Sequence, residues 1–352
     1  MHSIPTDFET MCSFENLYQA YKKARSGKRD KSVCAKFELH TTESLLKLRD
    51  ELLSGTYRME PYTEFMVYEP KERLVKASSF RDRIVQHTLC DNVLQYRVVN
   101  HFIYDNYASQ KGKGTHFGLN RLWKFMRSYY RNCGTEGWIL KADISKFFYS
   151  IDHDILKEQL KRYILDKRVL KLCFDIIDST IGVGIPIGNQ TSQVFALMYL
   201  NDLDHLIKDQ MRIKYYGRYM DDFYIILQDK NELKEIKKVI EAEIIKLRLQ
   251  INPKTQIFPL KNGIDFLGFH SYLTDSGKVV KKIRRDSKNN VRRRLRRLKR
   301  LKKQGVVSGK TVQQSYNSWM GHAKHGNTYH LRKNVEDEFA DMVGAKKGSV
   351  SK

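Results

Sequence analysis

Cysteines and long hydrophobic runs are scarce in this sequence. The five cysteines lie far apart and include no CxxC pair, which argues against a disulfide framework or a zinc site and favours reduced thiols in a cytoplasmic protein. The longest unbroken apolar run, Val194 to Leu200, is far too short to cross a membrane. Residues 1–15 contain no basic segment followed by an apolar core, so we expect no secretory signal.

Acidic residues are scarce relative to basic ones. The chain has 64 Lys and Arg against 40 Asp and Glu, a formal charge of +24 and an isoelectric point near 9.7. This balance is typical of a protein that binds a phosphate backbone, although membranes and acidic proteins also attract such a charge. A length of 352 residues with 41% hydrophobic content allows two or three subdomains with a packed core.

Two adjacent aspartates, Asp221 and Asp222, stand between two strand-like segments. Residues 215–219 are rich in tyrosine, with Gly217 among them, and residues 223–227 are aromatic or aliphatic. This pattern predicts a β-hairpin with two carboxylates at its tip. Asp is also common in ordinary turns, so the pair alone does not define a site.

A third carboxylate, Asp143, lies in the apolar segment 138–144, which we predict to be a strand. Strands that bring carboxylates together at one edge create a cation site, because Mg²⁺ takes one or two carboxylates plus substrate phosphates. Two such ions about 4 Å apart stabilise the attacking and leaving oxygens of an in-line phosphoryl displacement. Asp143, Asp221 and Asp222 therefore suggest a nucleotidyl-transfer centre.

The N-terminal part combines helical and hairpin patterns. Residues 14–21 and 45–53 repeat apolar side chains at helical spacing, so we expect residues 1–60 to be helical. Residues 65–76 alternate as in a β-hairpin whose turn carries Lys71 and Arg73. These two cations either grip an anionic group or are solvated surface charges.

A glycine- and lysine-rich loop follows a further helical pattern. Residues 80–94 have helical spacing, with Arg81 and Arg83 at their start, and the loop carries Lys111 and Lys113 just before the next predicted helix. Glycines let a backbone approach a phosphate chain closely, and a helix N-terminus adds positive potential. The spacing differs from that of a Walker A loop, which disfavours NTPase activity.

The C-terminal part is strongly basic. From Lys281 to Lys303, 14 of 23 residues are Lys or Arg, and leucines at a three-residue spacing predict a basic amphipathic helix. A membrane-surface or calmodulin-type helix is the competing interpretation, but the arginine density favours a nucleic-acid backbone. His322 and His325 have no cysteine nearby, so we expect a structural or RNA-contacting role rather than a zinc site.

The pattern of residues 185–193 predicts a tight glycine turn that opens a buried helix. Together with the segments described above, it makes the chain resemble the reverse transcriptase family across nearly its whole length. Asp143-Ile-Ser-Lys-Phe-Phe148 resembles motif A of that family, and Ile187-Gly-Asn-Gln-Thr-Ser-Gln193 resembles motif B. Tyr219-Met-Asp-Asp222 is similar to motif C, Leu249–Thr255 to motif D and Phe266-Leu-Gly-Phe-His270 to motif E. The order and spacing of A, B and C together make the resemblance specific.

Departures from the common pattern narrow the subfamily. Many reverse transcriptases begin motif B with Gln-Gly and end it with Ser-Pro, whereas Ile187 and Gln193 take those ends here. An aliphatic residue followed by GxxxSQ resembles the enzymes of diversity-generating retroelements and their group II intron-like bacterial relatives. Residues 80–87, 111–116 and 319–325 show the same resemblance.

The resemblance implies an α+β right-hand polymerase fold with fingers, an antiparallel-sheet palm and a helical thumb. The expected order is a helical extension at 1–60, fingers at 61–138, the palm at 139–270, a basic thumb at 271–345 and a disordered tail at 346–352. It also implies an RNA-directed DNA polymerase that uses two Mg²⁺ ions, for which Mn²⁺ can substitute.

The resemblance further implies a role for each matching residue. The catalytic carboxylates would be Asp143, Asp221 and Asp222, with the backbone of Ile144 as a further metal ligand. The incoming dNTP would be bound by Lys71, Arg73, Phe148, Ile187, Gly188, Gln193 and Lys254, although Lys254 is equally explained as a surface lysine. The primer grip would be Phe266, Leu267 and Gly268. Nucleic acid would be bound by Arg81, Arg83, Lys111, Lys113, Arg292, Arg293, Arg296 and Arg297.

The sequence leaves the biological role open. The expected partners are a template RNA, an RNA–DNA duplex and dNTPs, with no membrane. The first hypothesis is the mutagenic enzyme of a diversity-generating retroelement, acting with a small accessory protein. The alternatives are a phage-defence reverse transcriptase acting with a second defence protein, and a catalytically inactive RNA-binding scaffold.

Overall fold

The computed structural model describes residues 7–29, 31–68 and 72–343. It is an α+β structure with antiparallel strand pairs, as predicted. The chain forms two compact units: one contains the part up to Lys111, Ala142–Phe223 and Ile236–Thr255, and the other contains Gly112–Lys141, Tyr224–Glu235 and the part from Gln256 onward. The expected disordered tail at 346–352 lies outside the described residues.

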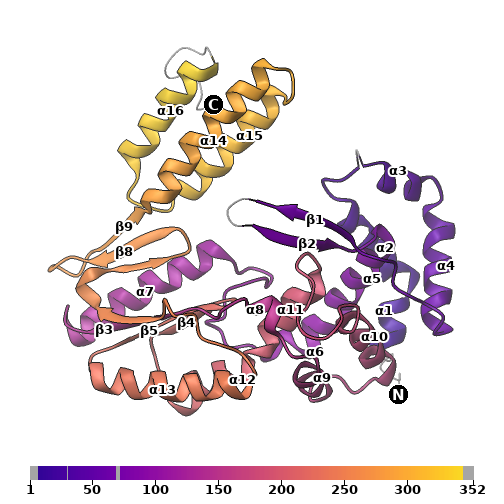
Figure 1. The fold of residues 1–352 in the computed structure, drawn as a ribbon, viewed down its shortest axis with the longest axis horizontal. Helices are drawn as coiled ribbons and strands as arrows, with labels where there is room; N and C mark the ends of the chain where they lie inside the picture. Colours follow the sequence, from indigo (N-terminus) through magenta and orange to yellow (C-terminus); the bar gives the residue numbers. More distant parts are fainter. Residues whose placement is uncertain (1–6, 30, 69–71, 344–352) are drawn as a thin grey trace. The chain divides into compact units, whose positions relative to one another are not determined.

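The first unit begins with four helices, coloured indigo in Figure 1: α1 (Asp7–Cys12), α2 (Phe14–Arg25), α3 (Ser32–Leu39) and α4 (Thr41–Leu53). The two predicted amphipathic helices correspond to α2 and α4. Helix α3 lies within the expected helical extension but was not predicted as a separate helix, because Cys34 is its one buried residue and its apolar side chains do not form a stripe.

A hairpin and a buried helical segment follow. Strands β1 (Thr63–Val67) and β2 (Arg73–Ala77) pair with Thr63 opposite Ala77, which confirms the predicted hairpin. Ser79 caps α5 (Phe80–Leu89) by accepting a hydrogen bond from the Asp82 amide. The segment continues through η1 (Cys90–Leu94), α6 (Gln95–Arg97) and η2 (Val99–His101).

The central elements carry the sequence motifs. A four-stranded sheet has the order β4-β5-β3-β6, formed by β3 (Trp138–Ala142), β4 (Tyr216–Tyr219), β5 (Asp222–Leu227) and β6 (Gln256–Pro259). The helices between these strands are α8 (Phe147–Ser150), α9 (His153–Lys161), α10 (Lys167–Ile177), α11 (Gln190–Tyr199), α12 (Asn201–His205), η3 (Leu206–Gln210) and α13 (Lys230–Lys246).

The second unit contains α7 (Thr115–Cys133), the turn η4 (Leu260–Asn262) and a sheet of β7 (Ile264–Phe266), β8 (Phe269–Leu273) and β9 (Val279–Ile283). The prediction of one helix over 281–303 was wrong at its start. Residues 281–283 pair in β9 with 269–271, so the basic helix α14 begins at Arg285. Burial of Val279 and Ile283 in the sheet outweighs the high charge of this segment.

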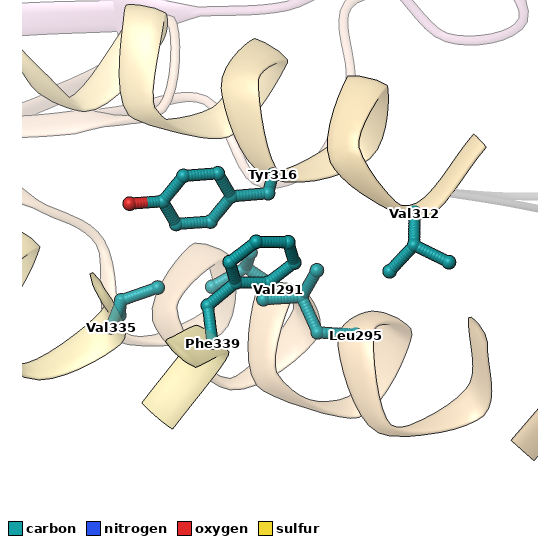
Figure 2. Close-up of a cluster of buried hydrophobic side chains, with 6 residues drawn as sticks. All are labelled: Val291, Leu295, Val312, Tyr316, Val335 and Phe339. Carbon is teal, nitrogen blue, oxygen red and sulfur yellow. The ribbon is translucent and has the colours of Figure 1, made fainter. Parts of the chain in front are cut away.

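Three C-terminal helices form a bundle: α14 (Arg285–Lys303), α15 (Gly309–Ala323) and α16 (Tyr329–Val343) (Figure 1). Their shared core consists of Val291, Leu295, Val312, Tyr316, Val335 and Phe339, drawn in Figure 2. The Tyr316 and Phe339 rings stack with their centroids 4.1 Å apart. None of the helices in the described ranges is both long and apolar enough to span a membrane.

Candidate active site

The aspartate pair lies at the tip of the β4–β5 hairpin, as predicted. Tyr219 ends β4 and Asp222 begins β5, so Met220 and Asp221 form the turn. Met220 has a left-handed φ of 57°, a conformation that a non-glycine residue adopts only when its surroundings hold it there. The turn therefore presents Asp221 from a strained and closely supported backbone.

The structure brings Asp143 and Asp221 together. Asp143 directly follows β3, and its carboxyl group lies close enough to that of Asp221 to raise the pKa of Asp221. Burial, followed by the nearby Asp143 carboxylate, raises the pKa of Asp221 to about 6, while Arg73 acts in the opposite direction.

Asn252 orients Asp143, a role that was not predicted. The Asn252 side-chain amide donates to Asp143 Oδ2 at 2.9 Å, and its backbone N–H donates to the Asp143 carbonyl at 2.8 Å. The Asp143 N–H in turn donates to Thr255 Oγ1 at 3.4 Å. Asn252 and Thr255 lie within the segment that resembles motif D, so that resemblance was the one available signal.

The carboxylate pair fits a Mg²⁺ site completed by substrate. Within residues 7–29, 31–68 and 72–343, no three His, Cys, Asp or Glu side chains are grouped closely enough to hold a metal ion. Asp222 therefore does not form a three-carboxylate cluster with Asp143 and Asp221. Two carboxylates with further oxygens from substrate phosphates are the usual Mg²⁺ ligand set. Ile144, predicted as a backbone ligand, is buried next to Asp143 and pairs with Ile251.

Of the two predicted triphosphate-binding cations, the structure describes one. Lys71 lies outside the described residues. Arg73 is the first residue of β2, and its side chain is exposed. Its charge is close enough to Asp221 to lower the pKa of that carboxyl group, so Arg73 belongs to the electrostatic environment of the carboxylate pair.

The segment resembling motif B packs against β2. The Ile187 carbonyl accepts a hydrogen bond from the Lys76 N–H at 3.1 Å. A Cβ atom on Gly188, whose φ is +126°, would lie 3.0 Å from the Lys76 carbonyl oxygen and 3.2 Å from a Val75 methyl group. Glycine at 188 is therefore required by close backbone approach. Asn189 Nδ2 also donates to the Tyr62 hydroxyl at 2.9 Å.

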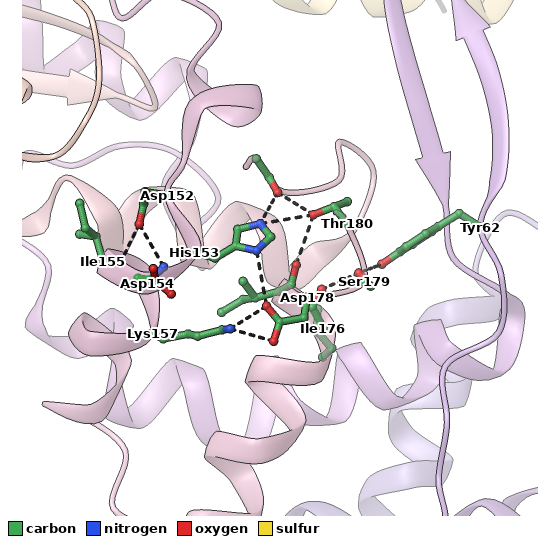
Figure 3. Close-up of polar contacts among 12 residues, drawn as sticks. Tyr62, Asp152, His153, Asp154, Ile155, Lys157, Ile176, Asp178, Ser179 and Thr180 are labelled. Carbon is green, nitrogen blue, oxygen red and sulfur yellow. Dashed lines mark hydrogen bonds and ion pairs between the residues drawn. The ribbon is translucent and has the colours of Figure 1, made fainter. Parts of the chain in front are cut away.

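A buried histidine supports the loop before motif B (Figure 3). His153 Nε2 donates to the Gly184 carbonyl at 2.8 Å, and its Nδ1 lies 3.4 Å from Asp178 Oδ1. Asp178 also pairs with Lys157 at 2.6 Å, and the next residue, Ser179, hydrogen-bonds to the Tyr62 hydroxyl at 2.8 Å. These contacts join the loop to α9 and to the start of β1.

The remaining predicted nucleotide-binding residues differ in burial. Phe147 is 2% exposed and belongs to the core, whereas the adjacent Phe148 is half-buried. Their ring centroids lie 5.8 Å apart. Gln193 accepts a hydrogen bond from the Ser109 hydroxyl at 3.3 Å. Lys254 is exposed two residues after Asn252, whose side chain accepts its N–H.

The predicted primer grip is a tight turn between β7 and β8. Phe266 pairs with Phe269, and both intervening residues are left-handed, with φ of 47° at Leu267 and 87° at Gly268. Two left-handed residues are typical of a type I′ hairpin turn. A Cβ at position 268 would meet the His322 ring at 3.1 Å, so α15 packs closely against this turn.

Some of the predicted nucleic-acid-binding cations are paired within the protein, and others have exposed side chains. Arg81 pairs with Glu51 and lies over the Tyr57 ring, contacts that give it a structural role. Arg292 pairs with Glu338 at 2.8 Å, and Arg293 donates to Asn290. The side chains of Lys111, Arg293, Arg296 and Arg297 are exposed, and those of Arg83, Lys113 and Arg292 are partly buried.

In the second unit, the glycine–lysine loop borders a cavity of about 760 Å³ together with α15. Residues 112–117 form one wall of this cavity, and Asn317, Ser318 and His322 line another. The His116 ring stacks on His325 with centroids 3.6 Å apart. The histidines therefore pack the loop onto α15, which is the structural role expected for His322 and His325.

Comparison with known proteins agrees with this geometry. Residues 69–271 match the family described as reverse transcriptase (RNA-dependent DNA polymerase). The chain is 26% identical to Protein YkfC of Escherichia coli (strain K12) over 272 residues, covering 63% of this chain and 69% of YkfC. It is 23% identical over 189 residues to the putative COX1/OXI3 intron 1 protein of Saccharomyces cerevisiae, covering 49% of this chain and 21% of that protein.

The paired carboxylates at a strand end and a hairpin tip, in an α+β chain, are the arrangement of a nucleotidyltransferase. The family match covers more than half of the sequence, so the chain belongs to the reverse transcriptase family and is an RNA-directed DNA polymerase by class. The bacterial and intron-protein relatives agree with the expected group II intron-like branch. The chain spans about a fifth of the length of the yeast intron protein.

Proposed function

We propose that this protein copies RNA into DNA by extending a 3′-hydroxyl one nucleotide at a time, with release of pyrophosphate. The observation that carries the proposal is the contact between Asp143 and Asp221, with Asn252 holding Asp143 in place. When bound, Mg²⁺ lowers the pKa of the attacking hydroxyl and neutralises charge that develops on the α-phosphate. Asp143 and Asp221 would be its protein ligands, assisted by Asp222 and the Ile144 backbone.

The nucleotide would be held by residues around this pair. Arg73, together with Lys71, would donate charge-assisted hydrogen bonds to the β- and γ-phosphates. The half-buried Phe148 ring would lie under the sugar and leave no space for a 2′-hydroxyl. Ile187, Gly188 and Gln193 would contact the incoming base pair, and Lys254 would protonate the leaving pyrophosphate.

Template and primer would be bound mainly by the second unit. The Phe266–Gly268 turn would hold the primer end. Lys111, Lys113 and the exposed arginines of α14 would contact phosphates of an RNA template or an RNA–DNA duplex. In this assignment residues 61–138 form the fingers, 139–270 the palm and 271–345 the thumb.

A primer-extension assay tests the polymerase proposal against the scaffold alternative. The purified protein should incorporate dTTP on poly(rA) primed with oligo(dT) in the presence of Mg²⁺, and EDTA should abolish the product. RNA binding without incorporation under these conditions would favour an inactive RNA-binding scaffold.

For the biological role we propose the mutagenic enzyme of a diversity-generating retroelement. Ile187 supports this choice, because an aliphatic side chain in place of the more common glutamine loosens the contact to the incoming base pair. Sequencing the RNA that co-purifies with the protein, together with its cDNA, tests the role. Adenine-specific substitutions in cDNA from a protein-coding repeat are expected. Faithful or repetitive cDNA from a noncoding RNA would instead identify a defence enzyme.

A further inference from the structure

A fully buried arginine lies directly behind the catalytic turn. Arg218, in β4, has no solvent exposure, and neither does its partner Asp204. Arg218 Nε donates to Asp204 Oδ1 at 2.7 Å, and Nη2 donates to the other carboxylate oxygen. The buried Tyr216 hydroxyl donates to the same carboxylate. A buried guanidinium requires this degree of pairing, because an unpaired charge in the interior is strongly destabilising.

The remaining donors of Arg218 are directed at two backbone carbonyls. Nη1 donates to the Met220 carbonyl at 2.8 Å, and Nη2 donates to the Leu197 carbonyl at 3.1 Å. Met220 is the left-handed residue of the turn, and its carbonyl belongs to the peptide that leads into Asp221. Leu197 belongs to α11, the helix that the motif B segment opens. One side chain therefore links the metal-binding turn to the helix behind the nucleotide site.

The backbone of Arg218 is itself fixed. Its N–H donates to the Asp105 carbonyl at 3.0 Å, and its carbonyl accepts from the Tyr107 N–H at 2.9 Å. The Asp204 carboxylate therefore meets an arginine that is held at both its backbone and its guanidinium. A planar guanidinium can serve the carboxylate and two carbonyls at fixed angles, whereas a lysine ammonium on a flexible stem cannot do so.

We propose that Arg218 is a positioning residue for metal binding. Its guanidinium holds the Met220 carbonyl, and this contact fixes the position of Asp221 beside Asp143. This inference rests on the proposed role of the carboxylate pair. Arg218 acts through the turn and does not contact substrate. This role was not predicted, because an arginine in a strand next to tyrosines is usually a surface residue.

The test compares Arg218→Lys with Tyr216→Phe. Tyr216→Phe removes a hydrogen bond to the same Asp204 carboxylate but leaves the contact with the Met220 carbonyl intact, so it serves as the matched control. Three quantities are measured for each variant: the unfolding midpoint, the affinity for Mn²⁺ from paramagnetic titration with primer–template bound, and the Mg²⁺ concentration that gives half-maximal single-turnover extension.

Arg218→Lys is expected to weaken Mn²⁺ binding and raise the Mg²⁺ requirement by about 10-fold or more, the usual effect of losing a residue that orients a metal ligand. Tyr216→Phe should stay within about twofold of wild type on both measures, even where its unfolding midpoint falls equally. Wild-type metal affinity in Arg218→Lys, or equal shifts in both variants, would overturn the proposal.

A double variant covers the case in which Arg218→Lys does not fold. Arg218→Met with Asp204→Leu removes both charges and leaves neither unpaired, so the fold is expected to persist. It too should lose Mn²⁺ affinity, and unchanged affinity would contradict the inference. The Mn²⁺ titration does not depend on catalysis, so a wild-type protein that binds Mn²⁺ but extends no primer would refute only the proposed function.

Discussion

At the scale of single residues, the proximity of Asp143 and Asp221 makes the metal-free protein less stable while it provides the ligands for a metal ion. Two carboxylates in contact at a partly buried site repel each other once both are ionised, and a divalent cation removes that repulsion. Metal binding requires both carboxyl groups to be deprotonated. The metal-free fold is therefore least stable at the pH values at which the site can bind a metal ion.

Asp221→Asn is therefore expected to stabilise the metal-free protein at neutral and higher pH. The pKa of Asp221 is raised from 3.8 to about 6 in the folded state, so its stabilising contribution is complete below the unfolded value and is lost as pH rises through the folded one. Removing the buried charge, and with it the repulsion from Asp143, should raise stability by roughly 1–3 kcal/mol at about pH 8 and by little near about pH 4.

Thermal unfolding of wild type and Asp221→Asn at both pH values, with and without Mg²⁺, measures this effect. Mg²⁺ should stabilise the wild type and narrow the difference between the two proteins. A difference that is the same at both pH values would show that ionisation of Asp221 does not destabilise the folded protein.

Substitutions of the two adjacent phenylalanines should have different effects, one on sugar selection and the other on stability. Phe148→Ala should raise ribonucleotide incorporation, because the half-buried ring is the one available beside the nucleotide. Phe147→Ala removes a side chain that is 2% exposed, so it should cost about 3–5 kcal/mol of stability without changing sugar selection. The measurement is the ratio of dTTP to UTP incorporation on one template. An unchanged ratio in Phe148→Ala would refute the proposal that this ring excludes a 2′-hydroxyl.

The carboxylates of the candidate active site could be predicted from the sequence, and the residues that orient them could not. Asp143 and Asp221 are conspicuous because each follows directly on an apolar segment, one at the end of β3 and the other at the tip of the β4–β5 hairpin. Asn252 and Arg218 are polar residues of common type, and their roles come from tertiary contacts with Asp143 and Met220. Local sequence does not encode such contacts, so the structure was needed to find them.

At the scale of secondary-structure elements, the junction of β2 with the motif B segment is the most constrained feature near the site. The Lys76–Ile187 hydrogen bond and the close approach at Gly188 make the hairpin and the start of α11 one assembly. Tyr62, through Ser179 and Asn189, adds a second attachment at the start of β1. A change at this junction should therefore affect nucleotide binding more than overall stability.

Gly188→Ala tests the junction, with Gly182→Ala as its matched control. Both glycines have positive φ and precede α11, but a Cβ at 182 would meet nothing, whereas one at 188 would lie 3.0 Å from the Lys76 carbonyl. The two variants should share a strain cost of about 1 kcal/mol, and Gly188→Ala alone should raise the KM for dNTP several-fold. Equal KM values in the two variants would contradict the coupling.

The elements themselves were predictable where one periodicity dominates. The β4–β5 hairpin, the β1–β2 hairpin and the helices α2, α4 and α5 follow their patterns of apolar residues. Prediction failed where charge and burial disagree, as in β9, whose lysines concealed a strand that buries Val279 and Ile283. Helix α3 was covered only by the general expectation of helix over residues 1–60, because it has no apolar stripe to detect.

At the scale of the whole molecule, charge is the dominant property. A formal charge of +24 is more than solubility requires, and much of the excess lies on α14, which exposes arginines on the side away from its buried Val291 and Leu295. Helices α15 and α16 bury the apolar stripe of α14, which leaves its basic face available to phosphates.

Binding of an RNA–DNA duplex should therefore weaken steeply with salt. If six or more phosphates are neutralised, affinity should fall by about 10³-fold or more between about 50 and 200 mM salt. Replacing Arg296 and Arg297 with Gln should reduce the slope of log affinity against log salt by nearly two, since each residue displaces about one counterion. A flat salt response, measured by fluorescence anisotropy of a labelled duplex, would contradict the role of the basic surface.

The most direct test of the central claim is single-turnover incorporation of one nucleotide on an RNA template with Mg²⁺. We predict that wild type extends the primer, that Asp143→Asn and Asp221→Asn lose at least about 10³-fold in rate, and that all three bind the primer–template equally. Asp175→Asn, which alters an exposed carboxylate paired with Lys171, should match wild type. Near-wild-type extension by either Asp143→Asn or Asp221→Asn would show that the paired carboxylates are not the catalytic centre.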